Sequence, residues 1–315
     1  MNATAIILAK RLARQIIGRP ILGRSILVYH RIAEASFDPW NIAVSPHEFE
    51  RQLVALRTKT VLPLQEFVSL HGRGRLPQDA VAITFDDGYA CNALVAAPML
   101  QSFGYPATFF VVSDAIKHGN EFWWDQIEFI FHAPGFDRAM AKRLLVSYSA
   151  NATRAEVGKR QATYESFFEF WDDLRYISGE ERCQYLDALR TQTGLETEVR
   201  STHRPMTSTE LSSLAANPLF EIGGHTATHP SLPTLSRAEQ EREIVSGAQF
   251  LEGALGKRIL SFSYPYGEWK VATREIVMAA GFECALAAAH KRVRSGDDRF
   301  TLPRRQVGNR SAHSY

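Results

Sequence analysis

The sequence has only three cysteines, the widely spaced Cys91, Cys183 and Cys284. This number and spacing exclude both a disulfide framework and a cysteine metal cluster. No apolar run approaches the roughly 18 residues that a membrane-spanning helix requires. The 36 Lys and Arg residues nearly balance the 34 Asp and Glu residues, so the excess of positive charge typical of a nucleic-acid-binding protein is also missing. A composition that is 45% hydrophobic and 22% charged excludes a disordered chain, and 315 residues fit one barrel or one decorated α/β domain.

Acidic residues are absent before Glu34, whereas six Lys or Arg residues precede it. Within residues 1–20, Lys10, Arg11 and Arg14 share one helical face opposite apolar residues, which predicts a basic amphipathic helix. Its apolar stretch is too short for a secretory signal. The helix would either lie on an anionic membrane surface or dock on its own domain. We therefore expect a cytoplasmic protein, with peripheral contact at the inner face of the membrane as the alternative.

Short apolar segments alternate with amphipathic helical patterns along most of residues 21–315. The predicted strands are Ser25–Tyr29, Ala80–Phe85, Pro106–Val112, Leu219–Ile222, Ile259–Tyr264 and Glu283–Ala288. The predicted helices are Pro46–Thr58, Ala93–Phe103, Thr207–Ala216, Ser236–Leu255 and Val271–Ala280. This alternation is typical of parallel strands covered by helices. About six or seven such units favour an α/β barrel over an open sheet, with 283–288 as the last inner strand.

Residues 121–205 interrupt the alternation with many aromatic and charged residues. The segment begins with FWWDQIEFIF, and Phe167, Phe168, Phe170 and Trp171 lie near its middle. The pattern predicts a mainly helical insertion between two barrel units rather than an independent domain. Its aromatic residues either form the core of the insertion, which we favour, or provide a surface on which sugars stack.

Three polar clusters directly follow predicted strands. In the first, Thr84–Gly88 (TFDDG), the adjacent carboxylates of Asp86 and Asp87 disfavour each other's ionisation unless a cation lies nearby. Gly88 permits the sharp turn that would direct both side chains toward one site. The same residues would also suit an ordinary Asx-type turn at the start of a helix.

The second cluster, His225–His229 (HTATH), follows the predicted strand 219–222 and two glycines. Its four-residue spacing lets two imidazoles reach one metal, although such a pair taken alone is more often structural. Together with a carboxylate from another strand end, two imidazoles form the ligand set of a catalytic divalent site that leaves a position open for water.

The third cluster, Ser263–Gly267 (SYPYG), contains a tight turn in which the backbone N–H of Tyr266 would face the same site. Taken without the other clusters, an ordinary aromatic turn explains it equally well. Polar groups that converge from the carboxyl ends of several strands are how α/β barrels build active sites. The convergence of the three clusters is therefore the main argument for a functional site.

These three motifs, in this order, resemble those of the polysaccharide deacetylases, the NodB-homology group (family 4) of carbohydrate esterases. The resemblance runs from about Ser25 to Val307. It implies a distorted (β/α)7 barrel that removes acetyl groups from sugars with a divalent metal, Zn²⁺ being the expected ion. It also implies these roles: Asp86 as general base for a metal-bound water, Asp87, His225 and His229 as metal ligands, and the Tyr266 N–H as oxyanion donor. Residues that adjoin the motifs, namely Tyr89, Tyr264 and Pro265, are the candidate substrate-binding residues.

The sequence departs from the family pattern in two places. Many members carry an Arg in the third motif that pairs with the base carboxylate, whereas Ser263 occupies that position here. They also supply a catalytic acid from a Leu-x-His motif, whose spacing is missing from residues 284–290 (CALAAAH). His30, after the first strand, is the favoured partner of Asp86. The further base-orienting or acid candidates are Arg304, Arg305 and His290, the last of which would otherwise be an exposed loop histidine.

Together these features predict an enzyme that removes an N-acetyl group from a sugar during synthesis of a surface glycan or glycolipid precursor. The lack of a secretory signal favours a nucleotide-linked, lipid-linked or oligosaccharide substrate over mature cell-wall polymer. Deformylation or cyclic amide hydrolysis on the same barrel is the enzymatic alternative. A catalytically weak sugar-binding module is the alternative from another class, suggested by the two departures.

Overall fold

The computed structural model describes residues 23–35, 38–148, 167–177, 179–195 and 199–309. The helix predicted for residues 1–20 lies outside these ranges, so that prediction is not tested. Within the described residues, no helix is long and apolar enough to cross a membrane.

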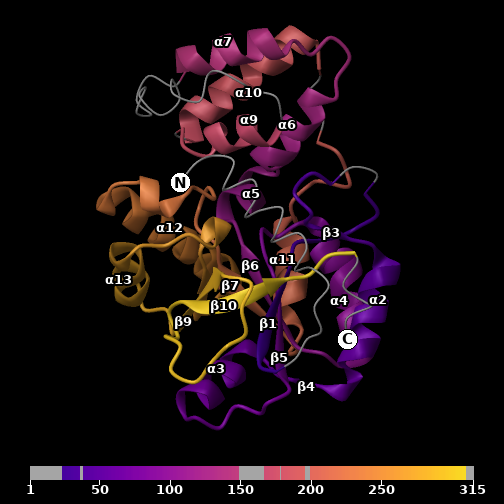
Figure 1. Ribbon diagram of the computed structural model, residues 1–315, viewed down its shortest axis with the longest axis vertical. Helices are drawn as coiled ribbons and strands as arrows, with labels where there is room; N and C mark the ends of the chain where they lie inside the picture. Colours follow the sequence, from indigo (N-terminus) through magenta and orange to yellow (C-terminus); the bar gives the residue numbers. More distant parts are fainter. Residues whose placement is uncertain (1–22, 36–37, 149–166, 178, 196–198, 310–315) are drawn as a thin grey trace.

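Seven parallel strands form a closed ring, which confirms the predicted barrel (Figure 1). β1 pairs with both β5 and β10, and this double pairing closes the ring. β4 (Thr60–Val61) pairs with the first two residues of β5, and β6 pairs with the same edge of β5 from Thr84 on. β4 is therefore an addition to the ring. In ring order the strands are β1 (Ser25–Tyr29), β10 (Leu302–Gln306), β9 (Cys284–Ala288), β8 (Ser261–Ser263), β7 (Phe220–Gly224), β6 (Ala107–Val111) and β5 (Ala80–Phe85).

The ring strands are short apolar runs because helices cover them outside while side chains fill the barrel inside. Phe85 stacks on Phe109 inside the main core, with 4.9 Å between ring centroids. A small second sheet, β2 (Arg31–Ile32) with β3 (Ala43–Val44), follows β1. The helices around the ring are α2 (Pro46–Ala55), α3 (Leu64–Gly72), α4 (Ala97–Phe103), α11 (Ser208–Ala216), α12 (Arg237–Leu255) and α13 (Val271–Ala279).

Local sequence signals set the ends of these helices. α11 and α12 begin with capping boxes at Thr207 and Ser236, whose hydroxyls accept the backbone N–H of the Glu three residues later. α12 ends at Gly256 in the left-handed conformation that glycine favours. The predicted helices agree with the structure within a few residues, but α3 was not predicted.

The prediction that residues 283–288 form the last inner strand was wrong, because β10 follows and completes the ring. The segment LPRRQ was missed because Pro303 and two arginines interrupt an otherwise apolar pattern. This strand carries Arg304, which proves central to the site.

Five described helices lie between β6 and α11. Four of them gather above the barrel, at one end of the molecule (Figure 1). Trp123 and Trp124 are buried in their core with Ile127, Tyr185 and Leu189. The side chains of residues 167–170 lie outside the described part. The five helices are α5 (Ser113–His118), α6 (Trp123–Phe131), α7 (Arg138–Tyr148), α9 (Phe167–Leu174) and α10 (Gly179–Thr193).

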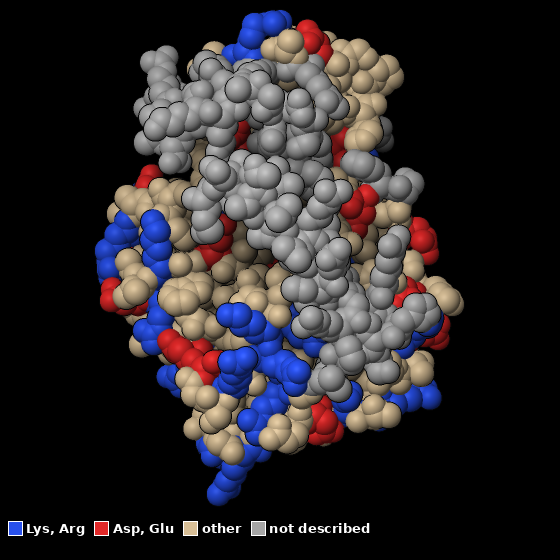
Figure 2. Space-filling model, in the orientation of Figure 1, with Lys and Arg blue, Asp and Glu red and all other residues tan. Residues whose placement is uncertain are grey.

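The face of the molecule drawn in Figure 2 carries basic and acidic side chains near one another, with a gathering of Lys and Arg over the lower barrel. This mixture agrees with the formal net charge of +2.

Candidate metal centre and active site

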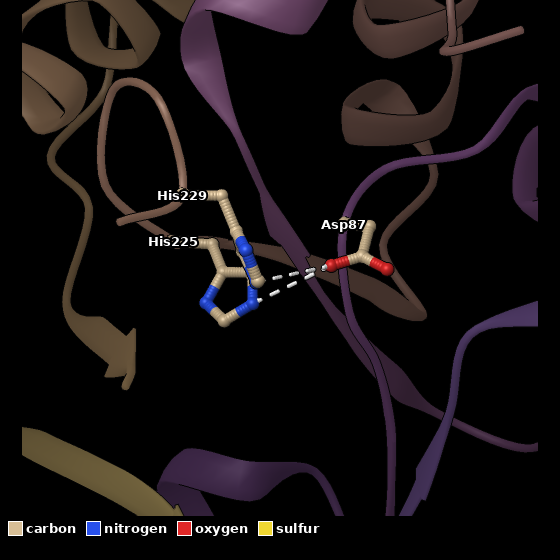
Figure 3. A group of neighbouring side chains, drawn as sticks. All are labelled: Asp87, His225 and His229. Carbon is tan, nitrogen blue, oxygen red and sulfur yellow. Dashed lines mark ion pairs between the residues drawn. The ribbon is translucent and has the colours of Figure 1, made fainter. Parts of the chain in front are cut away.

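Asp87, His225 and His229 converge at the carboxyl ends of two ring strands (Figure 3). Asp87 lies just beyond β5, and the two histidines follow β7. The Nε2 atoms of His225 and His229 each lie 3.6 Å from the same oxygen, Oδ1 of Asp87. All three residues are buried. The structure thus brings together the three residues that the sequence suggested as metal ligands.

The geometry of these three side chains fits a divalent metal. Ligand atoms about 2.0–2.2 Å from a tetrahedral Zn²⁺ lie roughly 3.3–3.6 Å apart, close to the two distances measured to Asp87. The Nδ1 atom of His225 lies 2.7 Å from the carbonyl oxygen of Ser263. Because a carbonyl only accepts, Nδ1 carries the hydrogen and the Nε2 lone pair faces the cluster.

The electrostatics of the cluster also suit a cation. Burial alone would raise the pKa of Asp87, but the neighbouring side chains of His225, His30 and His229 outweigh it and lower that pKa. Burial, aided by the neighbouring His225, lowers the pKa of His229 to about 3. At neutral pH the site therefore offers a carboxylate and a neutral His229 imidazole, the forms that bind metals.

Asp86, beside Asp87 in the chain, faces a different partner. Arg304 donates from Nη1 to Oδ1 of Asp86 at 2.7 Å and from Nη2 to Oδ2 at 2.5 Å. Ser263 joins the pair, since its hydroxyl accepts from Arg304 at 2.8 Å and lies 3.2 Å from Oδ2 of Asp86. Burial would raise the pKa of Asp86, but Arg304, with a contribution from His225, lowers it far below its ordinary value.

Arg304 therefore makes the contact with Asp86 that the sequence assigned first to His30. Arg304 takes the place of the arginine that is missing from the third motif. Its guanidinium reaches Asp86 from β10 and also bonds to Ser263, the residue at the motif position. A strand interrupted by Pro303 gave no signal that its arginine points into the barrel.

Of the other candidates for base orientation or proton transfer, His30 lies near the aspartate pair, whereas Arg305 and His290 lie elsewhere. The His30 imidazole lies near enough to Asp86 and Asp87 to lower the pKa of both. Its Nδ1 atom is buried and has no hydrogen-bond partner among the described residues. Arg305 follows Arg304 on β10, so its side chain leaves the opposite face of the strand. His290 lies in the turn after β9, where burial and Arg305 lower its pKa.

Three of the residues that build the site have left-handed backbone conformations. The φ angles are 74° for Asp87, 58° for His229 and 58° for Tyr266. Such conformations cost non-glycine residues about 1–3 kcal/mol each and persist where the surroundings enforce them. Gly267 follows Tyr266 at φ 69°, and a Cβ atom there would lie 2.3 Å from the Cβ atom of Ala288. The YPYG turn is therefore pressed against the end of β9.

Helix α12 holds the loop between the two histidines. Oε2 of Glu243 accepts the backbone N–H of Thr228 at 2.9 Å, and Oε1 accepts the Thr228 hydroxyl at 2.8 Å. One helical turn later, a Cβ atom at Gly247 would lie 2.7 Å from the carbonyl carbon of Thr226. The sequence gave no hint of either residue, because both fit an ordinary helix pattern.

The insertion supplies one wall of the site. The ring of Trp124 lies 4.7 Å from that of His229, centroid to centroid, and Tyr266 lies 4.6 Å away. Trp124 Nε1 donates to the hydroxyl of Tyr89 at 2.8 Å, which donates to Asp125 at 2.7 Å. Burial raises the pKa of Asp125 to about 8.

Three predicted substrate-binding residues are placed differently from the expectation. Tyr89 is fully buried in the hydrogen-bonded chain just described. Tyr264 is fully buried too, and its hydroxyl donates to the carbonyl of Phe300 at 2.9 Å. Pro265 is buried at the start of the YPYG turn. These side chains shape the walls rather than a surface that a sugar can reach.

Comparison with known proteins supports the motif assignment. The polysaccharide deacetylase family model matches residues 73–285, more than half of the chain. The poly-beta-1,6-N-acetyl-D-glucosamine N-deacetylase of Staphylococcus aureus (strain MSSA476) is 30% identical over 108 residues, which cover 30% of this chain and 37% of that protein. The alignments thus span little more than a third of the curated relatives' own length.

Solved structures share the fold at low sequence identity. The Streptococcus pyogenes deacetylase PplD, solved in complex with acetate, has a TM-score of 0.59 and 16% identity, covering 93% of this chain and 96% of that one. IcaB from Ammonifex degensii has a TM-score of 0.58 and 21% identity, covering 92% and 94%.

Proposed function

This chain belongs to the polysaccharide deacetylase family, and we propose that it hydrolyses the N-acetyl group of an amino sugar within a glycan or glycan precursor. The observation that carries the proposal is the division between two adjacent carboxylates. Asp87 faces two imidazoles, whereas Asp86 is held by an arginine. Such a pair provides one metal ligand and one separate group for proton transfer.

Asp87, His225 and His229 would hold the metal, for which Zn²⁺ is our proposal. When bound, a divalent ion at this position polarises an acyl carbonyl and makes a water molecule more acidic. Three protein ligands leave a coordination position open, as catalytic rather than structural sites do.

Asp86 is our candidate for the group that takes the proton from the attacking water. Arg304 and Ser263 fix the orientation of its carboxylate and keep it ionised. Because its pKa is low, Asp86 is a weak base, so the transfer would rely on a water that a bound divalent ion has made more acidic. His30, beside both carboxylates, is our candidate for a second proton-transfer group.

Tyr266 is our candidate for the oxyanion donor. Its left-handed backbone lies in a turn held by Gly267 and Ala288. A backbone N–H fixed in this way would meet the developing negative charge without reorganisation, an effect typically on the order of 3 kcal/mol.

The relatives support an N-acetylated glycan as substrate, since the Staphylococcus aureus protein is named for poly-beta-1,6-N-acetyl-D-glucosamine. A nucleotide-linked or lipid-linked precursor is the more specific proposal, together with a cytoplasmic location and peripheral membrane contact through residues 1–20. Liposome binding by the full chain and by a form lacking residues 1–20 tests the membrane contact, and equal binding would contradict it.

A mass-spectrometric screen tests the activity. The zinc-loaded protein is incubated with acetylated and formylated amino sugars in free, oligomeric, nucleotide-linked and lipid-linked form. We expect loss of an acetyl group from at least one substrate, and no loss with the Asp86→Asn variant. Loss of formyl groups alone would indicate a deformylase. Bound zinc without hydrolysis of any substrate would indicate a sugar-binding module.

A further inference from the structure

Arg175 is a buried cation at the junction between the helical insertion and the barrel. It lies just beyond α9 and is only 8% exposed, so its charge depends on partners within the protein. Its guanidinium donates to Oε1 of Glu268, in the loop after β8, at 2.5 Å and lies 3.6 Å from Asp172 on α9 itself. The other oxygen of Glu268 accepts the Ser231 hydroxyl at 2.6 Å, so this carboxylate is fixed on both sides. The ion pair therefore fastens the insertion to the loop that carries the YPYG turn.

The same guanidinium lies over the ring of Tyr266. Its central carbon is 4.7 Å from the centroid of this ring, closer than to the rings of Trp171 and Tyr176, at 5.1 and 5.2 Å. The attraction between a cation and an aromatic face is strongest where water is excluded. Arg175 thus contacts the turn twice, through the Tyr266 ring and through the carboxylate two residues later.

The backbone of the turn needs such restraints. Tyr266 has a φ of 58°, which persists in a non-glycine residue only where the surroundings enforce it. On one side, Gly267 is pressed against Ala288 at the end of β9. On the other side, the Tyr266 hydroxyl donates to the carbonyl of His229 over 3.3 Å, a long hydrogen bond. Arg175 adds the charged restraint, which holds both the ring of Tyr266 and the loop that follows it.

We propose that Arg175 is a positioning residue for the oxyanion site: it holds the YPYG turn in the conformation that directs the Tyr266 N–H toward the reacting group. The inference rests on the proposed deacetylase function and extends it, because it makes a segment outside the barrel part of the catalytic geometry. Arg175 acts through Tyr266 and Glu268 rather than on the substrate. A preorganised donor stabilises developing charge without reorganisation, so a turn released from Arg175 should stabilise the oxyanion less.

Hydrogen exchange tests this role without substrate. Exchange of the backbone N–H groups of residues 264–268 is followed by mass spectrometry in the full chain. Arg175→Gln removes the charge and should speed this exchange at least tenfold, while β5 keeps wild-type exchange. Arg190→Gln is the matched control, because Arg190 also pairs with a carboxylate, Asp187 at 2.7 Å, and links α10 to α6 within the insertion. It should leave the exchange of the turn unchanged.

A second variant covers the case in which Arg175→Gln speeds exchange throughout the chain. Glu268→Gln removes the same ion pair from the barrel side and leaves the core of the insertion intact. It should speed exchange of the turn at least fivefold without affecting β5. Unchanged exchange of the turn in Arg175→Gln would overturn the positioning role. Global exchange in Arg175→Gln with unchanged exchange in Glu268→Gln would overturn it as well.

Kinetics separate positioning from substrate binding. On the acetylated sugar that the wild type hydrolyses, Arg175→Gln should lower kcat at least tenfold and keep KM and zinc affinity within twofold. Arg175→Lys should recover part of the loss, since an ammonium still faces the ring but bonds Glu268 less well. A raised KM with unchanged kcat would overturn the role, because it would place Arg175 in substrate binding. Faster exchange of the turn in the variants, with no hydrolysis by the wild type, would reject the deacetylase function alone.

Discussion

Arg304 binds both carboxylate oxygens of Asp86 although β1 lies between their strands in the ring. The guanidinium therefore crosses the mouth of the barrel to reach a residue 218 positions earlier in the chain. Both side chains are buried, so neither charge has bulk water as an alternative partner.

Removing the arginine should damage both stability and catalysis. Arg304→Gln leaves Asp86 buried without its cation, a change that typically costs about 3–5 kcal/mol. The wild-type pair stabilises the fold above the unfolded pKa of Asp, about 3.9, and loses this effect as pH falls toward the lower folded pKa. Urea unfolding of both proteins should therefore show a gap at pH 7 that narrows in acid.

Arg304→Lys keeps the charge but loses the two-pronged contact, so kcat should fall about tenfold or more while the bound metal remains. Arg305→Lys, on the opposite face of β10, is the matched control and should retain kcat. Equal kcat values for Arg304→Lys and the wild type would contradict an orienting role for Arg304.

Substitution of the candidate base Asp86 and of the candidate metal ligand His229 should give different results in a metal assay. Asp86→Asn should keep its zinc and lose nearly all turnover, whereas His229→Ala should lose the zinc itself. Elemental analysis after dialysis measures the metal, and acetate release measures turnover. Equal zinc loss in both variants would overturn the division of roles.

Gly247 lies where α12 packs against the loop between His225 and His229, so a larger side chain there should weaken metal binding. Gly247→Ala places a methyl group against the Thr226 backbone, so the loop must move and zinc affinity should fall about 10-fold or more. Gly253→Ala, on the same helix, has no atom within 4 Å of the added carbon. It should keep its zinc affinity and gain up to about 1 kcal/mol in stability. Zinc titration of both variants with a competing chelator checks this.

The two candidate histidines should differ in their effect on the pH–rate profile. His30 lies beside the aspartate pair, so His30→Ala should lower kcat and shift a limb of the profile. His290→Ala should give the wild-type profile, because no described contact joins His290 to the cluster. Two wild-type profiles would reject both histidines as proton-transfer groups.

Asp125 should make the protein less stable as the pH rises from about 4 to about 8. Its pKa is raised to about 8, so the folded state binds a proton that the unfolded state has lost above pH 4. Stability should therefore fall as pH rises from about 4 to 8, by at most about 1.4 kcal/mol per pH unit. Asp125→Asn should flatten the profile of thermal unfolding against pH, and an unchanged slope would contradict the raised pKa.

The sequence was sufficient for the parts of the site that depend on local signals. Asp87, His225 and His229 follow apolar runs that end abruptly, and the ends of parallel strands meet at one edge of a barrel. The role of Arg304 could not be predicted from local signals, because its strand contains a proline and its partner Asp86 lies on the other side of β1 in the ring. The roles of Glu243 and Gly247 could not be predicted either, since they arise only where α12 packs against the loop between His225 and His229.

The position of β10 also bears on the order in which the molecule can assemble. β1 is made first but pairs with the last strand, so the ring cannot close until residue 306 has been synthesised. Contacts between such distant segments form slowly, because a long loop must be ordered before any pairing compensates for it. The same strand carries Arg304, so barrel closure and pairing of Asp86 are one event. In a nascent chain, all three candidate metal ligands are therefore synthesised before Arg304, the partner of Asp86.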